Sequence, residues 1–132
     1  MKFLLDTDTC IYALKQNEEV LRRLLSTPRE DVAISVITEA ELRTGAAKSS
    51  SPARTLRLIE NFLRPLAILE FTSEDAAAYA SVRAKLERAG TPIGPLDTLI
   101  ASQAFGRKLA LVSNNEREFR RVAGLAVENW SL

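Results

Sequence analysis

The sequence has 132 residues, of which 46% are hydrophobic and 27% are charged. This length fits one folded domain and leaves no room for a second, so we expect a single domain over residues 1–132. Eighteen lysine and arginine residues stand against 17 acidic residues, and the net charge of +1 excludes a strong overall attraction to nucleic acid. Because the chain has no histidine, any hydrolytic chemistry must use carboxylates, hydroxyls or the single thiol.

The single cysteine and the N-terminal residues bear on location. Cys10 cannot form an internal disulfide, and Asp6 interrupts the N-terminal apolar run before a signal peptide could develop. We therefore expect a cytoplasmic protein, with Cys10 as a small buried residue without chemistry. No apolar run approaches the ~20 residues needed to cross a bilayer, so we expect no membrane residence.

The first half of the chain alternates short apolar runs with amphipathic segments. Strands are expected at 2–5 and 32–34, where the residues are apolar and flanked by turn-forming or capping residues. Cap residues and prolines predict four helices in this half. These helices are expected at 7–15, 17–26, 35–48 and 51–63.

The second half continues the same alternation. A third strand is expected at 67–71, a fourth at 109–113 and a fifth at 126–129. Helices are expected at 73–90, where acids follow the cap, at 96–105, where Gly106 should stop the helix, and at 116–122.

Strands that alternate with helices and are apolar on both faces indicate a parallel sheet covered on both sides. We therefore expect an α/β fold of three layers, α/β/α, with a central, mostly parallel sheet of four to five strands. In such sheets, ligands bind beyond the carboxyl ends of the strands, and this rule selects the polar residues that matter.

Asp6 directly follows the first strand, where a ligand-binding carboxylate would lie. A strand-end aspartate often serves only to form a turn, so this position alone leaves both interpretations open. Asp8 is expected to cap a helix and to add to the negative field of the site.

Two further acids lie on helical faces that are otherwise mostly apolar. Glu41 shares a face with Ile37, Ala40 and Thr44, and burial of a carboxylate there is costly unless it is paired or binds a cation. Glu39 can instead pair with Arg43 four residues later, which is an ordinary surface arrangement.

Asp97 opens the helix that follows Gly94 and Pro95, and its face continues through Ile100, Ala101 and Ala104. A first-turn acid that complements the helix dipole explains this position equally well. The combination of Asp6, Glu41 and Asp97 is more informative than any one of them. Three carboxylates in a chain without histidine suit an oxygen-only Mg²⁺ or Mn²⁺ site, and such a metal serves phosphodiester hydrolysis.

Four segments resemble the VapC branch of the PIN-domain nucleases. They are Leu4–Tyr12, Ile34–Thr38 leading to Glu41, Ile93–Ala101 and Val112–Phe119. These segments occur in the order of the family and span nearly the whole chain. The resemblance implies a Mg²⁺-dependent endoribonuclease toxin that cuts structured RNA, usually tRNA, and is inhibited by a small co-expressed VapB-like antitoxin. It also implies a homodimer. Because attack by a 2′-hydroxyl usually recruits histidine, which this chain lacks, we expect product ends with 5′-phosphate and 3′-hydroxyl groups.

The resemblance assigns roles residue by residue. Asp6, Glu41 and Asp97 match the three acidic metal-site residues, and Thr7 matches the adjacent hydroxyl. At the fourth position many members carry aspartate where this chain has Asn115, so Glu118 is the other candidate for the remaining carboxylate. A basic group near the same end provides candidate phosphate contacts, although a run of charges is usually only a solvated surface. Its members are Arg107, Lys108, Arg117, Arg120 and Arg121.

Two alternatives remain open from the sequence. The run from Asp6 to Thr9 after an apolar strand also matches haloacid-dehalogenase-like phosphatases, in which Asp6 would be a nucleophile and Asp8 an acid/base. That family requires a second acid pair at a strand end, and none follows Asp97. The other alternative is a module that binds RNA without cutting it, because Asn115 weakens the expected metal site.

Overall fold

Five short strands form one sheet, and every neighbouring pair is parallel. The computed structural model describes residues 1–132. The order in the sheet is β3-β2-β1-β4-β5. The strands are β1 (Phe3–Leu5), β2 (Val32–Ser35), β3 (Ala67–Leu69), β4 (Ala110–Val112) and β5 (Val127–Glu128). The expected α/β class with a central parallel sheet is confirmed.

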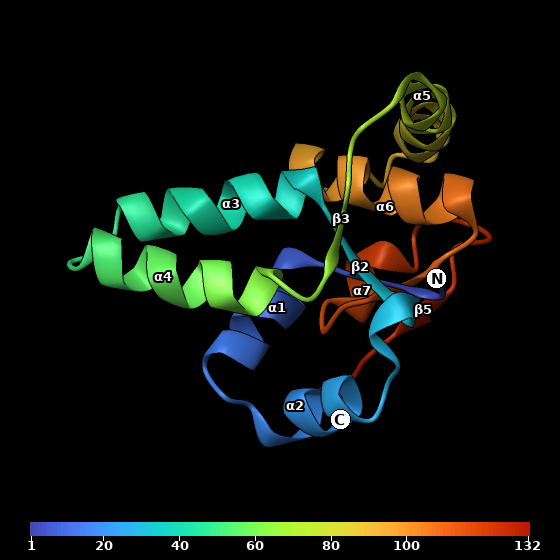
Figure 1. Ribbon diagram of the computed structural model, residues 1–132. Helices are drawn as coiled ribbons and strands as arrows, with labels where there is room; N and C mark the ends of the chain where they lie inside the picture. The colour runs from blue at the N-terminus through green and yellow to red at the C-terminus, as the bar shows by residue number, and fades with distance from the viewer.

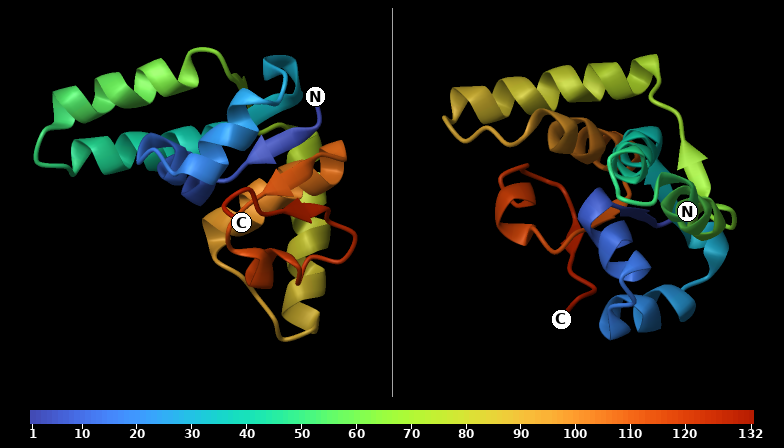
Figure 2. Two further views of the ribbon diagram at one scale, coloured as in Figure 1. Left: turned by 90° about the horizontal axis from the view of Figure 1, so that it is seen from below. Right: turned by 90° about the vertical axis from the view of Figure 1, so that its left-hand side faces the viewer.

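Seven α-helices connect these strands. They are α1 (Thr7–Leu14), α2 (Glu18–Leu25), α3 (Val36–Ala47), α4 (Pro52–Leu63), α5 (Ser73–Arg88), α6 (Pro95–Arg107) and α7 (Glu116–Phe119), with a 3₁₀ turn at Arg29–Asp31. Figures 1 and 2 show α3 and α4 side by side as a hairpin that extends away from the sheet. None of the helices combines the length and apolar character that crossing a membrane requires.

The two faces of the sheet bury two separate hydrophobic clusters. Leu5 of β1 pairs in register with Ile34 and Val112, and all three lie in the cluster covered by α1, α2 and α4. Leu4, one residue earlier, points to the opposite cluster, which α5, α6 and α7 cover. This alternation follows from the two-residue period of a strand and produces the three expected layers.

The helix starts differ in detail from the expected caps. Asp6 itself is the N-cap of α1, because its Oδ1 accepts a hydrogen bond from the backbone N–H of Thr9 at 2.8 Å. Ser35 caps α3 as expected. The cap of α5 is Thr72 rather than Ser73, and Thr72 forms a reciprocal capping box with Asp75.

The end of α6 also differs from the prediction. The helix passes Gly106 and ends at Arg107, and its C-cap Lys108 has a left-handed backbone with φ of 59°. A Cβ atom on Gly106 would lie 3.1 Å from Cβ of Ala78 on α5, so this glycine permits close contact between two helices. The predicted stop was wrong because a glycine needed for close packing looks the same in sequence as a glycine that ends a helix.

Candidate active site

The carboxyl ends of β1 and β4 meet at the point where the strand order reverses direction. Asp6 follows β1, is only 3% exposed, and its backbone N–H donates to the carbonyl of Val112 at 3.0 Å. The side chain of Ser113, the residue after β4, hydrogen-bonds the Asp6 carboxylate. Thr9 also donates from its hydroxyl to the carbonyl of Val112 at 3.0 Å. The Asp6 carboxylate is therefore held by groups from the start of α1 and from the end of β4.

Thr7 links the start of α1 to the helix that carries the second acid. Its hydroxyl donates to Oε1 of Glu41 at 2.6 Å, and its Oγ1 lies 3.1 Å from Oγ1 of the buried Thr38. Glu41 is thereby drawn toward β1, while Glu39 on the same helix pairs with Arg43 at 2.9 Å as expected. The two glutamates of α3 thus have different surroundings.

Asp97 lies in the first turn of α6, where Pro95 occupies the first helical position. Its carboxylate lies beside Gly94, because a Cβ atom at Gly94 would be 3.5 Å from Oδ2 of Asp97. The turn before α6 thus leaves room on that side for the acid.

The segment after β4 holds the two candidates for the fourth position together. The side-chain amide of Asn115 donates to Oε2 of Glu118 at 2.9 Å, and the backbone N–H of Asn115 donates to Oγ of Ser113 at 2.9 Å. Asn114 donates to the hydroxyl of Tyr12 on α1 at 3.0 Å. The side chains of Asn115 and Glu118 are therefore hydrogen-bonded to each other.

The electrostatics of these acids indicate that they converge. Burial raises the pKa of Asp6 to about 6 against opposing hydrogen bonds from Ser113 and Thr9. Burial also raises the pKa of Asp97 to about 6, and the negative charges of Asp6, Glu41, Glu118 and Asp8 raise it further. The negative charges of Asp6, Glu41 and Glu118 thus act on Asp97, and a cation beside it would relieve this repulsion.

Oxygen donors of this kind fit a divalent metal ion in chemistry, because Mg²⁺ and Mn²⁺ prefer carboxylate and water ligands. As the side chains stand, no three acids are close enough together to hold an ion. One reason is visible at Glu41, whose Oε1 is already bonded to Thr7.

The expected basic residues fall into two groups. Arg107 and Lys108 do not lie near the acids as expected. They stand at the C-terminal end of α6, roughly 15 Å along the helix from Asp97. The guanidinium of Arg107 is also bound to Asp75 at 2.7 Å.

The other three basic residues follow β4, on the side of Glu118. Arg120 pairs with Glu116 at 2.7 Å, and Arg121 donates to the carbonyl of Pro92 at 3.0 Å. Arg117 is exposed and forms no ion pair, so it is the cation of this group most available to a phosphate.

Sequence reasoning assigned no role to Ser113 and Thr38, which are both fully buried next to the acids. The rule that ligands bind beyond the carboxyl ends of strands could have identified Ser113, because it directly follows β4. No local signal identifies Thr38, since its role depends on α1 and α3 lying side by side.

A comparison with known protein families decides the identity of this fold. The PIN-domain family matches residues 3–125. The chain belongs to the PIN-domain family. This PIN domain is 42% identical over 130 residues to the tRNA(fMet)-specific endonuclease VapC of Salmonella typhimurium, covering 98% of each chain. It is also 42% identical over 131 residues to ribonuclease VapC2 of Haemophilus influenzae, again covering 98% of each.

Solved structures agree with this assignment. The VapBC complex of Salmonella typhimurium bound to DNA contains a chain that matches this PIN domain with a TM-score of 0.94 and 41% identity, over 98% of each chain. VapBC2 of Rickettsia felis, bound to a promoter DNA fragment, matches with a TM-score of 0.91 and 35% identity, over 98% of this chain and 99% of that one. The resemblance is confirmed, and the chain is a nuclease of the VapC type.

Proposed function

We propose that this PIN domain is a Mg²⁺-dependent endoribonuclease that cuts structured RNA, with tRNA as the substrate class and the cytoplasm as its place of action. The observation that carries the proposal is the gathering of acids at the carboxyl ends of β1 and β4, where burial and the charges of Asp6, Glu41 and Glu118 raise the pKa of Asp97 to about 6. The name of the relative from Salmonella typhimurium, a tRNA(fMet)-specific endonuclease, supports tRNA as the substrate.

Asp6, Glu41 and Asp97 would hold the metal, for which Mn²⁺ is an expected substitute. A bound Mg²⁺ supplies a nucleophilic water at neutral pH and stabilises charge on the phosphate. The residues of this chain prepare the site. Ser113 and the backbone of Thr9 hold the Asp6 carboxylate, and the hydroxyl of Thr7, the next residue, holds the Glu41 carboxylate.

Glu118 would supply the fourth carboxylate, and Asn115 would position it. The hydrogen bond of 2.9 Å between them supports this division, as does the contribution of Glu118 to the raised pKa of Asp97. The amide oxygen of Asn115 can still accept a hydrogen bond from a metal-bound water, but it brings no charge.

The products would carry 5′-phosphate and 3′-hydroxyl ends. Cleavage through the 2′-hydroxyl usually recruits histidine as acid or base, and this chain has none. Direct attack of water on phosphorus leaves the phosphate on the 5′ side of the downstream product.

A small VapB-like antitoxin is the proposed inhibitor, because the matching solved structures are VapBC complexes. A basic side chain of the antitoxin placed against Asp6, Glu41 and Asp97 would complement their charge.

We also propose that the protein forms a homodimer. In addition, we propose that the unpaired Arg117 contacts phosphates of the RNA.

The two alternatives have less support. A phosphatase of the haloacid-dehalogenase type would use Asp8 as its acid/base beside Asp6, yet Asp8 is exposed in the first turn of α1. A module that only binds RNA would have no use for buried acids that repel one another.

The experiment compares cleavage of a tRNA pool by the purified protein and by matched variants, with Mg²⁺ titrated and product ends sequenced. We expect discrete cuts by the wild type, no cuts by Asp6→Asn or Glu41→Gln, and reduced cutting by Glu118→Ala with a higher Mg²⁺ requirement. Glu39→Gln is the control, because it removes a carboxylate from the same helix outside the site. Asn115→Asp should keep or improve cutting.

Equal cutting by wild type and Asp6→Asn would indicate a contaminating nuclease and reject the proposal. A 2′,3′-cyclic phosphate as the main product would reject the proposed attack of water. Superimposable Mg²⁺ curves for Glu118→Ala and the wild type would remove Glu118 from the site.

A further inference from the structure

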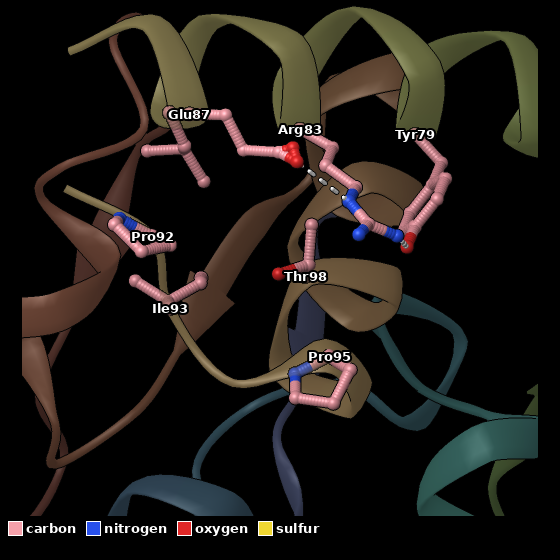
Figure 3. Close-up of a pocket in the computed structure, with 8 residues that line it drawn as sticks. Tyr79, Arg83, Glu87, Pro92, Ile93, Pro95 and Thr98 are labelled. Carbon is pink, nitrogen blue, oxygen red and sulfur yellow. Dashed lines mark hydrogen bonds and ion pairs between the residues drawn. The ribbon is translucent and has the colours of Figure 1, made fainter. Parts of the chain in front are cut away.

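A cleft of about 270 Å³ lies between α5 and the turn that leads into α6. Figure 3 shows Tyr79, Arg83 and Glu87 of α5 along one side, with Pro92, Ile93 and Pro95 of the turn facing them. Thr98 of α6 also lines the cleft, and its hydroxyl is already bonded to the carbonyl of Gly94 at 2.8 Å. No residue of the acid cluster lines this cleft, so it is a separate site.

The α5 side of the cleft presents an ordered set of donors and acceptors. Arg83 donates from Nη1 to the hydroxyl of Tyr79 at 2.8 Å and from Nε to Oε1 of Glu87 at 3.3 Å. The guanidinium carbon of Arg83 lies 5.9 Å from the centre of the Tyr79 ring. Oε2 of Glu87 and the second amino group of Arg83 have no partner, and both side chains are at least half exposed. A free acceptor and free donors therefore stand next to each other at the cleft.

The opposite side is apolar and rigid. Two prolines and Ile93 form the turn, and proline fixes the backbone φ angle. A flat ring inserted here would have apolar contacts on one side and the donor and acceptor of Arg83 and Glu87 on the other.

The cleft adjoins the acid cluster through the chain itself. Pro95 and Thr98 line the cleft, and Asp97 stands between them in the first turn of α6. The Asp97 carboxylate lies against Gly94, which is also the residue between Ile93 and Pro95. Residues that line the cleft and the acid Asp97 therefore share one turn of chain.

We propose that this cleft binds one unstacked nucleobase of the RNA substrate, from a nucleotide close to the cut phosphodiester. The inference rests on the proposed ribonuclease function and adds to it a specificity site. Proteins that recognise RNA loops hold splayed bases by contacts to their faces and by hydrogen bonds to their edges. Every base edge carries both donors and acceptors, which matches the adjacent carboxylate and guanidinium.

The charge of the cleft argues for a base rather than a phosphate or a cation. Arg83 and Glu87 are paired, so they neutralise each other and attract neither sign of ion. A phosphate at Arg83 would meet the carboxylate of Glu87, and a cation at Glu87 would meet the guanidinium.

The test uses the double variant Arg83→Ala, Glu87→Ala, which leaves the net charge of the protein unchanged. The matched control is Glu74→Ala, Arg88→Ala, which removes one exposed acid and one exposed base from the same helix outside the cleft. The substrate is a labelled tRNA-derived stem-loop in which the nucleotides of the loop are replaced one at a time by abasic nucleotides. Cleavage is followed with Mg²⁺, and binding is followed by fluorescence anisotropy without it.

We expect one abasic position to reduce wild-type cleavage and binding by roughly ten-fold, as loss of one stacked base does elsewhere. On intact RNA, cleavage and binding by the cleft variant should be lower than those of the wild type by the same factor. On that abasic RNA, the cleft variant and the wild type should be equal. The control variant should behave as the wild type does, and thermal melting should find both variants folded.

Three results would overturn the proposal. The first is equal sensitivity of the wild type and the cleft variant to every abasic position, so that the two losses add. The second is loss of cleavage and binding in the cleft variant at positions that differ from the one that affects the wild type. The third is a change in the mass of the protein in solution that assigns the cleft to contact between copies. Failure of the ribonuclease function is distinguishable, because the wild type would then cut no RNA while the anisotropy series still reports whether a base occupies the cleft.

Discussion

Asp6 and Asp97 lower the free energy of unfolding of the protein when no cation is present. Both carboxyls have a pKa of about 6 in the folded chain, against 3.8 for an ordinary aspartate. Between these two values the folded state binds more protons than the unfolded state, so the free energy of unfolding falls as pH rises from about 4 to 6 and stays low above that. The two carboxyls thus lower the stability of the metal-free protein at neutral pH.

We predict that Asp97→Asn stabilises the metal-free protein at pH 7 by about 1 kcal/mol, a value discounted because the carboxyl is partly exposed to solvent. At pH 4 the gain should disappear, because the wild-type carboxyl is then protonated. Urea unfolding in chelator at both pH values measures the difference, and Glu60→Gln, which neutralises an exposed acid of α4, is the control. Mg²⁺ should raise the melting temperature of the wild type at pH 7 but not that of Asp97→Asn. A variant less stable than the wild type at pH 7 would contradict this account.

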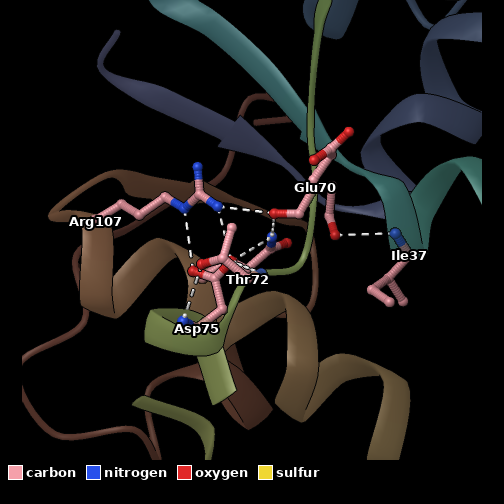
Figure 4. Close-up of polar contacts among 7 residues, drawn as sticks. Ile37, Glu70, Thr72, Asp75 and Arg107 are labelled. Atoms are coloured by element: carbon pink, nitrogen blue, oxygen red, sulfur yellow. Dashed lines mark hydrogen bonds and ion pairs between the residues drawn. The ribbon is translucent and has the colours of Figure 1, made fainter. Parts of the chain in front are cut away.

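At the scale of elements, α5 is fixed to α6 by a buried carboxylate. Figure 4 shows Asp75 receiving hydrogen bonds from Arg107 of α6, at 2.7 and 3.1 Å. Gln103 donates to the same carboxylate at 3.2 Å, and both Arg107 and Gln103 donate to the backbone carbonyl of Glu70. Burial would raise the pKa of Asp75, but the hydrogen bonds from Arg107, Thr72 and Gln103 outweigh it and hold the pKa at about 2.

We predict that Arg107→Ala lowers the free energy of unfolding by about 2 kcal/mol at pH 7, which is between the values for surface and buried ion pairs. Because the pKa of Asp75 is lowered on folding, this stability is present above about pH 4 and is lost as pH falls toward 2. The gap between variant and wild type in denaturant unfolding should therefore close in acid. Arg120→Ala removes an exposed pair with Glu116 and should cost less than about 0.5 kcal/mol. A gap that persists at pH 2 would show that Arg107 acts through packing.

At the scale of the whole molecule, the C-terminal segment closes the fold against its beginning. Trp130 is 1% exposed and its ring packs edge-on against Phe3 of β1 at 5.3 Å between centroids. Arg23 of α2 lies over the same indole at 5.2 Å, and Glu128 accepts hydrogen bonds from both Arg23 and Trp130. Residues from both ends of the chain thus share one cluster.

We predict that Trp130→Ala destabilises the protein by about 3–5 kcal/mol, as loss of a buried large aromatic does. Trp130→Phe should recover part of this loss, and Leu132→Ala, at an 84% exposed position, should cost almost nothing. Thermal and urea unfolding measure these differences. Since Trp130 is the only tryptophan, its fluorescence also reports unfolding of the wild type. A near-neutral Trp130→Ala would mean that the C-terminal segment adds little to the fold.

The sequence by itself determined the alternation of strands and helices, and with it the parallel sheet, because local apolar period and capping residues act within a few positions of the chain. It also placed Asp6, Glu41 and Asp97 at the ends or faces where a site would form, and those roles stay predictions until the variants are measured. The sequence did not predict the roles of residues that depend on partners far away in the chain. Gly106, for example, is predicted to stop a helix from the sequence alone, and only its contact with α5 shows that it permits close packing.

Only the tertiary structure decided which side chains meet. The strand order brings Ser113 to Asp6 across 107 positions, and the packing of α1 on α3 brings Thr38 and Glu41 to Thr7. The packing of α5 on α6 likewise binds the guanidinium of Arg107 to Asp75, away from the acids. Local sequence encodes propensity and charge, whereas the pairing of groups far apart in the chain is fixed by how sheet and helices pack, and that is why the site could be located but its supporting contacts could not.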